Sequence, residues 1–344
     1  MMMKTAVLKK IGTIEYEERA IPEPGPGEVL VKIRSVGICG SDLHYYTHGK
    51  IGSFVVEKPL VLGHESAGEI VALGAAVTDR RVGDRVSLEP GIPCRKCEFC
   101  KTGRYNLCPD VRFMATPPVD GAFAEYVVSP ADFAFKIPDA MTYDEAALME
   151  PLAVGVYAAE KAGLKPGMSA AVLGMGPIGM VVAQAAKAYG AYPVAGVDMI
   201  DFRLEKAAQL GVDRTFNGKM ADLEGAMIAS LNRQPEVVFE TAGASATLNL
   251  ATHLVKPGGT IVMIGMSPAD FTPINQGQIL GKELKILGIF RYANMYPKAI
   301  ELVQSGKVNV KALATHTFAL DQTKEALDFA LEHKGDSIKV MIHP

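Results

Sequence analysis

The hydrophobic pattern changes near position 150. Before it, short apolar runs alternate with turns, as in PEPGPGEVLVKIRSVG, RVGDRVSLEP and DGAFAEYVV. Short strands bounded by glycine and proline predict a β-rich domain. From position 151 onward, apolar strands alternate with helix-like segments, which indicates a second kind of fold.

The apolar strands of the second region are AAVL at 170–173, YPVAGVD at 192–198, EVVFETAG at 236–243, GTIVMIG at 259–265 and LKILGIF at 284–290. Their alternation with helices predicts an α/β fold, a doubly wound sheet of parallel strands. After position 290, two helix-like runs, YPKAIELVQSGK and DQTKEALDFALEHK, precede a strand-like SIKVMIH.

Composition agrees with two soluble domains. The chain has 344 residues, which is too long for one ordinary core. It is 49% hydrophobic and 21% charged, with a net charge of −3 and only short, isolated basic pairs, so no nucleic-acid partner is expected. The longest apolar stretch is broken by Gly, Pro and Gln and is a poor membrane span. The start MMMKTAVLKKIG lacks the apolar core of a signal peptide, so we expect a cytoplasmic chain without disulfides.

Four of the five cysteines lie in CRKCEFCKTGRYNLC, at Cys94, Cys97, Cys100 and Cys108. This spacing in a loop predicts a tetrahedral zinc site; an iron–sulfur cluster or four unrelated cysteines are the alternatives. Four thiolates leave zinc no open position for a substrate. We therefore interpret this zinc as structural and look for a catalytic metal elsewhere.

The fifth cysteine, Cys39, lies in VGICGSDLHYYTHG, and His64 and Glu65 follow in PLVLGHESAGEIVALG. Cysteine, histidine and glutamate are all zinc ligands. Taken singly, Cys39 and His64 would be ordinary buried residues. Together with the cysteine loop and the nucleotide motif described next, they indicate a catalytic metal site.

Gly174, Gly176 and Gly179 have G-x-G-x-x-G spacing between a predicted strand and a predicted helix. In this context the glycines allow a pyrophosphate to approach a helix N-terminus. Asp198 ends the next strand, about 20 residues later, where a carboxylate accepts hydrogen bonds from ribose hydroxyls and favours NAD over NADP. Arg203 weakens that preference, because an arginine can receive a 2′-phosphate.

Four further positions complete the predicted cofactor site. Pro177 and Ile178 lie within the glycine motif, while Thr241 and Gly265 lie at the ends of later strands. The carboxyl ends of parallel strands are where a dinucleotide binds.

The order GxCGSDxH, GHExxGxI, four-cysteine loop and GxGxxG resembles that of zinc-containing medium-chain dehydrogenases, over essentially the whole chain. The resemblance implies a GroES-like catalytic domain at 1–150, with a structural-zinc lobe at about 90–110, and a Rossmann NAD-binding domain at 151–289. Residues 290–344 are expected to return to the catalytic domain. It also implies two zinc ions per chain, an active site in the cleft between the domains, and a homotetramer.

Within this family the polyol branch fits best. EPLAVG places Glu150 where many alcohol dehydrogenases carry a third cysteine ligand, so Glu65, Glu150, or both in turn complete the zinc site; an acid in a helical first turn is the alternative for Glu150. The stretches CGSDLHYYTHG, FMATPPVDGAFAEYVV and FRYAN resemble sorbitol and xylitol dehydrogenases. They imply substrate contacts at Tyr45, Phe113, Glu150, Arg291 and Tyr292, with Arg291 also facing the cofactor.

Two features qualify this interpretation. Arg291 and Tyr292 could instead form an interdomain ion-pair and packing site. Animal sorbitol dehydrogenases typically lack the four-cysteine site, so the chain is more similar to microbial, plant or fungal relatives.

The resemblance implies oxidation of a secondary hydroxyl to a ketone, as in L-iditol 2-dehydrogenase. Zinc would lower the pKa of the substrate hydroxyl, Ser41 and His44 would carry the proton away, and NAD would take the hydride. Glu150 would hold or exchange with zinc-bound water. L-Threonine 3-dehydrogenase, butanediol dehydrogenase and a catalytically inactive nucleotide-binding protein are the alternatives.

Overall fold

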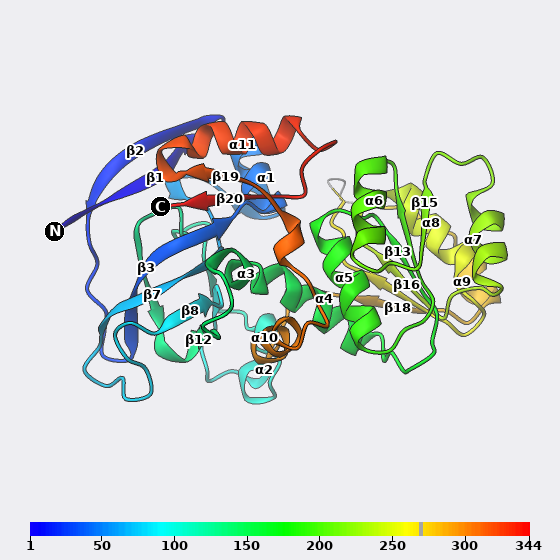
Figure 1. Cartoon of the computed structure of the whole chain (residues 1–344), viewed down its shortest axis with the longest axis horizontal. Helices are drawn as coiled ribbons and strands as arrows, with labels where there is room; N and C mark the ends of the chain where they lie inside the picture. Colours follow the sequence, from blue (N-terminus) through cyan, green and yellow to red (C-terminus); the bar gives the residue numbers. More distant parts are fainter. Residues whose placement is uncertain (268–270) are drawn as a thin grey trace. The chain divides into compact units, whose positions relative to one another are not determined.

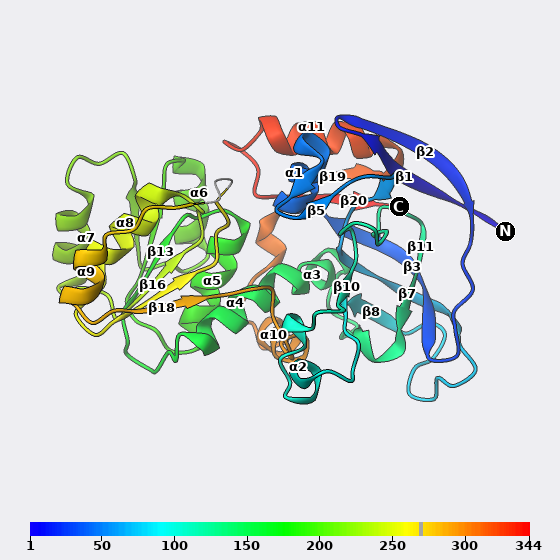
Figure 2. The same cartoon turned by 180° about the vertical axis from the view of Figure 1, so that it is seen from behind.

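The computed structural model describes residues 1–267 and 271–344, and the chain divides into two units. The first comprises Met1–Glu150 and Val310–Pro344, and the second comprises Pro151–Asn309. The β-rich first region and the doubly wound sheet predicted from the sequence are both present (Figures 1 and 2). Among the described residues, the longest helices fall short of the length and apolarity that crossing a bilayer demands.

A seven-stranded sheet is the centre of the first unit. Its strand order is β12-β8-β7-β3-β20-β19, and β11 pairs with β3 off this path. The strands are β3 (Glu28–Gly37), β7 (Glu65–Leu73), β8 (Arg85–Leu88), β11 (Tyr126–Pro130), β12 (Ala134–Lys136), β19 (Ala314–Ala319) and β20 (Lys339–His343). The strand-like SIKVMIH thus joins the sheet directly beside β3, far from it in sequence.

Smaller elements complete the first unit. A second sheet contains β1 (Met2–Lys10), β2 (Thr13–Ala20) and β6 (Leu60–Val61). The two-stranded pairs are β4 (Lys50–Ile51) with β5 (Phe54–Val55) and β9 (Gly91–Ile92) with β10 (Arg112–Phe113). The helices are α1 (Gly40–His48), α2 (Glu98–Lys101), α3 (Tyr143–Ala147) and α11 (Thr323–Glu332).

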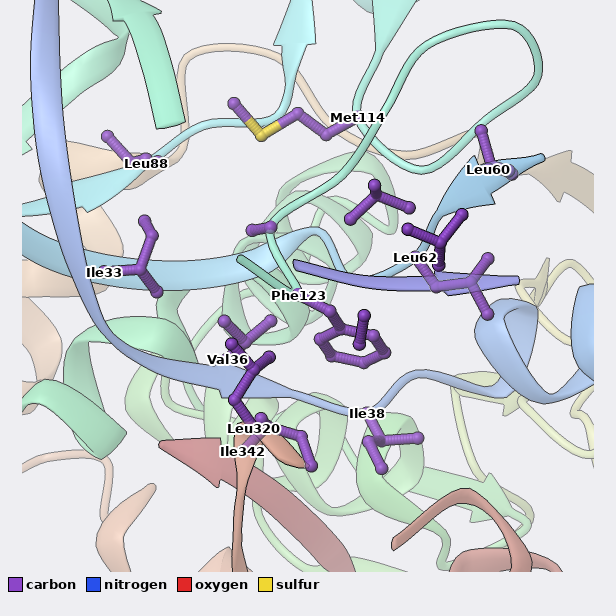
Figure 3. Packing of buried hydrophobic residues seen from close by; sticks show 14 of the residues in the cluster. Ile33, Val36, Ile38, Leu60, Leu62, Leu88, Met114, Phe123, Leu320 and Ile342 are labelled. Carbon is purple, nitrogen blue, oxygen red and sulfur yellow. The ribbon is translucent and has the colours of Figure 1, made fainter. Parts of the chain in front are cut away.

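The core of this unit forms around Phe123, which is fully buried. Figure 3 shows its ring among Val36, Ile38 and Leu62, so strands β3 and β6 and the loop after β10 meet there. A Cβ at Gly63 would lie 2.6 Å from the Phe123 ring. Because Gly63 also has a φ of 85°, only glycine fits at this position, directly before His64.

A six-stranded parallel sheet with the order β15-β14-β13-β16-β17-β18 forms the second unit. Its strands are β13 (Ala170–Leu173), β14 (Val194–Asp198), β15 (Arg214–Asn217), β16 (Val237–Glu240), β17 (Thr260–Met263) and β18 (Lys285–Gly288). The sequence pattern missed β15, because RTFN contains a single large apolar residue. Buried side chains such as Leu173, Val238 and Ile261 form its core.

Helices alternate with the strands in this unit, together with α4 before the first strand and α10 after the last. They are α4 (Met149–Lys161), α5 (Pro177–Ala188), α6 (Asp201–Gln209), α7 (Leu223–Leu231), α8 (Ser245–Leu254), α9 (Gln276–Gly281) and α10 (Tyr296–Gln304). Figure 1 shows α5 and α6 on one side of the sheet and α7, α8 and α9 on the other. This is the doubly wound arrangement.

The chain returns to the first unit at Val310, later than the expected position 290. Residues 290–309, including α10, belong to the second unit. Lys298 of α10 pairs with Glu160 of α4, and Asn309 N donates to the side chain of Gln184 on α5 (2.7 Å). The family resemblance implied the earlier boundary, whereas in the structure these polar contacts attach α10 and the residues after it to the second unit.

Candidate active site

Strands β3 and β7 bring the two candidate ligand segments together. Their antiparallel register places Gly37 opposite Glu65, and Cys39 follows two residues later. A Cβ at Gly37 would lie 2.3 Å from Glu65 Oε2, so glycine is needed for the Glu65 side chain to lie here. The segment after β3, which contains Cys39, and the start of β7, with His64 directly before it, therefore bring Cys39, His64 and Glu65 to one point.

Cys39, His64 and Glu65 form a compact donor set. Each offers a ligand atom, and the three atoms lie within 4.8 Å of one another. Glu65 Oε2 is buried and has no hydrogen-bond partner among the described residues. Because a buried carboxylate oxygen without a donor is costly, this atom is well suited to a cation. The thiolate, imidazole and carboxylate donors fit zinc.

Asp42 holds the backbone next to Cys39 and His64, although the sequence did not point to it. It is buried, and its carboxylate accepts the backbone N–H of Cys39 (2.9 Å) and of Gly63 (2.9 Å). His64 Nδ1 lies 3.8 Å from Asp42 Oδ1. Burial raises the pKa of Asp42, although His64 and these two donors act in the opposite direction. Its position at N3 of α1, in a capping box with Cys39, was the available signal.

Lys339 of β20 is the other residue that sequence analysis missed. Its ammonium donates to Glu65 Oε1 (2.5 Å) and to the carbonyl of Ile38 (2.9 Å). Burial lowers the pKa of Lys339, but the charges of Glu65 and Cys39 outweigh this and the net direction is upward. One buried cation thus holds both ligand segments.

The surroundings of His64 are strongly negative. Burial lowers its pKa, but Cys39, Asp42 and Glu150 outweigh this and raise the pKa to about 10. Such surroundings favour a dication. Glu150 is buried in the first turn of α4, and the converging donor set in the described chain contains Glu65 rather than Glu150. The geometry therefore favours Glu65 between the two candidate carboxylates.

The four-cysteine loop also forms a donor set. The ligand atoms of Cys94, Cys97, Cys100 and Cys108 lie within 4.8 Å of one another. Cys100 Sγ lies 3.4 Å from Cys97 Sγ and 3.9 Å from Cys94 Sγ. Tetrahedral zinc with bonds of about 2.3 Å separates its sulfurs by about 3.8 Å. Backbone N–H donors of Lys96 and Cys97 lower the pKa of the Cys94 thiol to about 7. The loop fits a closed zinc site.

The strands that flank the four-cysteine loop extend to the donor set of Cys39, His64 and Glu65. Strands β9 and β10 pair and close the loop, and β10 ends at Phe113. The Phe113 ring lies 5.5 Å from the His64 ring, so the predicted substrate residue is beside the candidate metal site. Within the loop, Tyr105 donates to the buried carboxylate of Glu89 (2.7 Å). Burial raises the pKa of Glu89 to about 8.

Helix α1 carries three more predicted residues. Ser41 lies in its first turn and is partly buried, Tyr45 is buried, and His44 is on the exposed side. Partial desolvation, together with His48 and Lys334, lowers the pKa of His44. An uncharged imidazole near neutral pH is able to accept a proton.

The glycine motif lies where the strand order of the second unit reverses, between β13 and β16. Gly174 has a φ of 103°, and a Cβ at Gly179 would lie 1.8 Å from the carbonyl of Gly174, so both positions need glycine. Gly176 is the N-cap of α5 and Pro177 and Ile178 begin its first turn. A topological switch point with a helix N-terminus fits a dinucleotide pyrophosphate.

Asp198 ends β14 beside this turn. Its carboxylate accepts the N–H of Met175 (2.7 Å) and of Ile200 (3.0 Å). Arg203 Nη1 lies 3.7 Å from Asp198 Oδ2, and Arg203 Nε is buried and finds no partner in the described part of the chain. The two predicted specificity residues are therefore neighbours.

Thr241 and Gly265 lie at the same edge. The Thr241 hydroxyl donates to the carbonyl of Gly174 (2.7 Å), and a Cβ at Gly265 would lie 2.2 Å from Gly243 N. Thr241 thus fixes the glycine turn, and Gly265 permits close packing of two loops.

Arg291 and Tyr292 belong to the second unit rather than to the catalytic domain expected from sequence. The Arg291 guanidinium lies 4.8 Å from the Phe290 ring centre, and its φ is 52°. Tyr292 is buried, with its ring 5.8 Å from that of Tyr296. Non-glycine residues in the left-handed region are uncommon, and such residues cluster at functional sites.

Comparison with known proteins agrees with these two units. Residues 25–139 match the alcohol dehydrogenase GroES-like domain, and residues 177–305 match the zinc-binding dehydrogenase family. The chain is 48% identical over 343 residues to sorbitol dehydrogenase of Bacillus subtilis, covering 99% of this chain and 97% of that protein.

Two solved structures match the chain over its whole length. An Escherichia coli oxidoreductase of unknown specificity has a TM-score of 0.96 at 40% identity, covering 100% of this chain and 99% of that one. An E. coli alcohol dehydrogenase complexed with NADH has a TM-score of 0.92 at 33% identity, again covering 100% and 99%. The chain therefore belongs to the zinc-containing medium-chain dehydrogenase family.

Proposed function

We propose that the protein oxidises a secondary hydroxyl of a polyol, such as sorbitol, L-iditol or xylitol, to a ketose with zinc and NAD. The main observation in support is the convergence of Cys39, His64 and Glu65, in which Glu65 Oε2 is buried and has no hydrogen-bond partner among the described residues. The 48% identity to a sorbitol dehydrogenase supports the substrate class.

Cys39, His64 and Glu65 would hold the catalytic zinc, which when bound supplies a Lewis acid that lowers the pKa of the substrate hydroxyl. Asp42 and Lys339 orient these side chains through the contacts described above. Glu150 acts from a greater distance through its charge. Tyr45 and Phe113 contribute the apolar side of the substrate pocket, with Phe113 beside His64.

Ser41 and His44 carry the proton away. They lie on the same helix, and the lowered pKa of His44 keeps its imidazole ready to accept a proton near neutral pH. The lobe of Cys94, Cys97, Cys100 and Cys108 would hold a second, structural zinc that fixes the loop between β9 and β10.

NAD would bind at the N-terminus of α5, with its ribose hydroxyls on Asp198. Arg203 lies beside that carboxylate. Arg291 and Tyr292 are proposed to complete the cofactor and substrate contacts. A homotetramer, which the family resemblance implies, belongs to the same proposal and can be tested by analytical ultracentrifugation.

A substrate panel tests the function. NADH absorbance is followed with sorbitol, L-iditol, xylitol, threonine and 2,3-butanediol, and zinc is measured on the same sample. We expect a higher kcat/KM for a polyol than for threonine or the diol, and two zinc ions per chain. A preference for threonine or butanediol would exclude polyol oxidation as the main activity, and one zinc per chain would contradict the two-site assignment.

A further inference from the structure

Two helices begin side by side at the switch point of the parallel sheet. Strand β13 leads into α5 and strand β16 leads into α8, and Leu173 pairs in register with Glu240. The N-termini of both helices therefore lie at the same edge of the sheet. Each carries the partial positive charge and free N–H groups that attract an anion.

The N-terminus of α5 has no side chain of its own to satisfy it. Its N-cap, Gly176, makes no side-chain cap hydrogen bond, and its first turn contains no acid. The N-terminus of α6 differs, because Asp198 accepts the N–H of Ile200 and Asp201 lies in the first turn.

Glu240 organises the loop that leads into α8. This side chain is only 2% exposed and ends β16. Its Oε1 accepts the N–H of Ala242 (3.0 Å), the N–H of Gly243 (3.0 Å) and the hydroxyl of Thr247 (2.7 Å). Ala242 and Gly243 precede the N-cap of the helix, Ala244, and Thr247 is the third residue of the helix. The buried carboxylate thus holds the loop before α8 and joins it to the first turn of the helix.

The same residue fixes the loop that contacts the glycine turn. The backbone carbonyl of Glu240 accepts the N–H of Ile264 (2.8 Å) and of Gly265 (3.0 Å), which links the ends of β16 and β17. Thr241, the next residue, donates its hydroxyl to the carbonyl of Gly174 (2.7 Å). Glu240 is therefore connected through one residue to the loop that precedes α5.

We propose that Glu240 is a positioning residue for the dinucleotide site. Its carboxylate holds the loop 241–243, and Thr241 of this loop supports the glycine turn, so that the turn keeps the shape that the pyrophosphate needs at α5. This inference rests on the proposed NAD-dependent function, and it assigns to Glu240 a role in cofactor affinity without contact to the cofactor.

Glu240→Gln tests the charge, because glutamine keeps one acceptor oxygen at nearly the same volume. The matched control is Glu236→Gln at the amino end of the same strand. Glu236 accepts the backbone N–H of Ser169 (2.6 Å) and pairs with Lys256 (3.1 Å), away from the glycine turn. Both variants lose a partly or fully buried, hydrogen-bonded carboxylate, so both are expected to unfold at a lower temperature.

NADH affinity separates the two variants. Fluorescence titration should show that Glu240→Gln raises the Kd for NADH about fivefold to tenfold, while Glu236→Gln stays within about twofold of the wild type. A Glu240→Gln variant that binds NADH as the wild type does overturns the inference, whatever its stability. A wild-type protein that fails to bind NADH overturns the proposed function instead, and this inference with it.

A milder variant covers the case in which Glu240→Gln does not fold. Thr247→Val removes one donor to the carboxylate and preserves the charge. We expect its Kd for NADH to rise about twofold to threefold, since one hydrogen bond to a charged group is lost. An unchanged Kd in a folded Thr247→Val protein, together with an insoluble Glu240→Gln protein, assigns Glu240 to stability alone and overturns the inference.

Discussion

The ammonium of Lys339 lies 2.5 Å from Glu65 Oε1, although 274 residues separate the two in the chain. Both side chains are almost fully buried, at 4% and 1% exposure. Breaking such a pair leaves one charge buried and unpaired, which costs about 3–5 kcal/mol. Lys339→Met should therefore lower the free energy of unfolding of the zinc-free protein by about that amount in urea titrations.

The double variant Lys339→Met with Glu65→Gln provides the control. It removes both charges, so its loss of stability should be smaller than that of Lys339→Met alone. If the stability lost in the double variant equals the sum of the losses in Lys339→Met and Glu65→Gln, the contact does not stabilise the fold.

The donor set at His64 predicts a selective loss of activity. His64→Ala removes one of three zinc donors, so turnover and one zinc ion per chain should be lost together. NADH binding should remain, because the glycine motif lies in the other unit. Activity assays, metal analysis and NADH fluorescence on one preparation check this, and surviving turnover would contradict the assignment.

Cofactor choice should depend on Asp198. Asp198→Ala removes the carboxylate beside Arg203. NAD then loses a hydrogen-bond acceptor for its ribose hydroxyls, and the 2′-phosphate of NADP is no longer repelled. The ratio of kcat/KM for NAD over NADP should therefore fall by about tenfold or more. Asp201→Ala is the matched control, because Asp201 is exposed and bonds only Asn217 among the contacts described for it (2.6 Å). An equal ratio in both variants would exclude Asp198 from this choice.

The four-cysteine loop should be needed for structure and not for chemistry. Cys100→Ala should release the structural zinc and lower the melting temperature, because closed zinc sites contribute folding free energy directly. Residual turnover per catalytic zinc should stay close to the wild type at low temperature. Complete loss of turnover in a folded variant with its catalytic zinc would contradict this separation.

One pH dependence comes from the pair His343 and Asp144, whose Nε2 and Oδ1 lie 2.7 Å apart. The hydrogen bond to Asp144 raises the pKa of His343. Burial raises the pKa of Asp144, but His343 and Ser35 outweigh this and the net direction is downward.

A raised histidine pKa stabilises the fold fully below its ordinary value of about 6.5, and this contribution is lost as the pH rises through the higher folded value. His343→Gln should thus lower the free energy of unfolding by about 0.5 kcal/mol at pH 5.5, a small value because solvent screens this exposed pair. At pH 9.5 the substitution should have almost no effect on the free energy of unfolding. Melting temperatures of both proteins across this range check the sign. An equal loss at both pH values would show that the pair is not charged.

Sequence alone was sufficient where the chemistry is local. Cys39 and His64 belong to recognisable motifs, and the register of β3 with β7 brings the segments that contain them together. Lys339 could not be predicted, because a lysine in a strand-like SIKVMIH has the pattern of an exposed position. Only the pairing of β20 beside β3 turns it toward Glu65. Glu240 could not be selected either, although its partners are close in sequence. In EVVFETAG it is a single polar residue at a strand end, and its partners follow in the next loop and helix.

The position of β20 also bears on the order of events during synthesis. The second unit is one continuous segment, residues 151–309, and can fold as it emerges. The seven-stranded sheet cannot close until β20 enters between β3 and β19. Until that step, Lys339 cannot pair with Glu65. The first unit is therefore complete only after the last strand has entered its sheet.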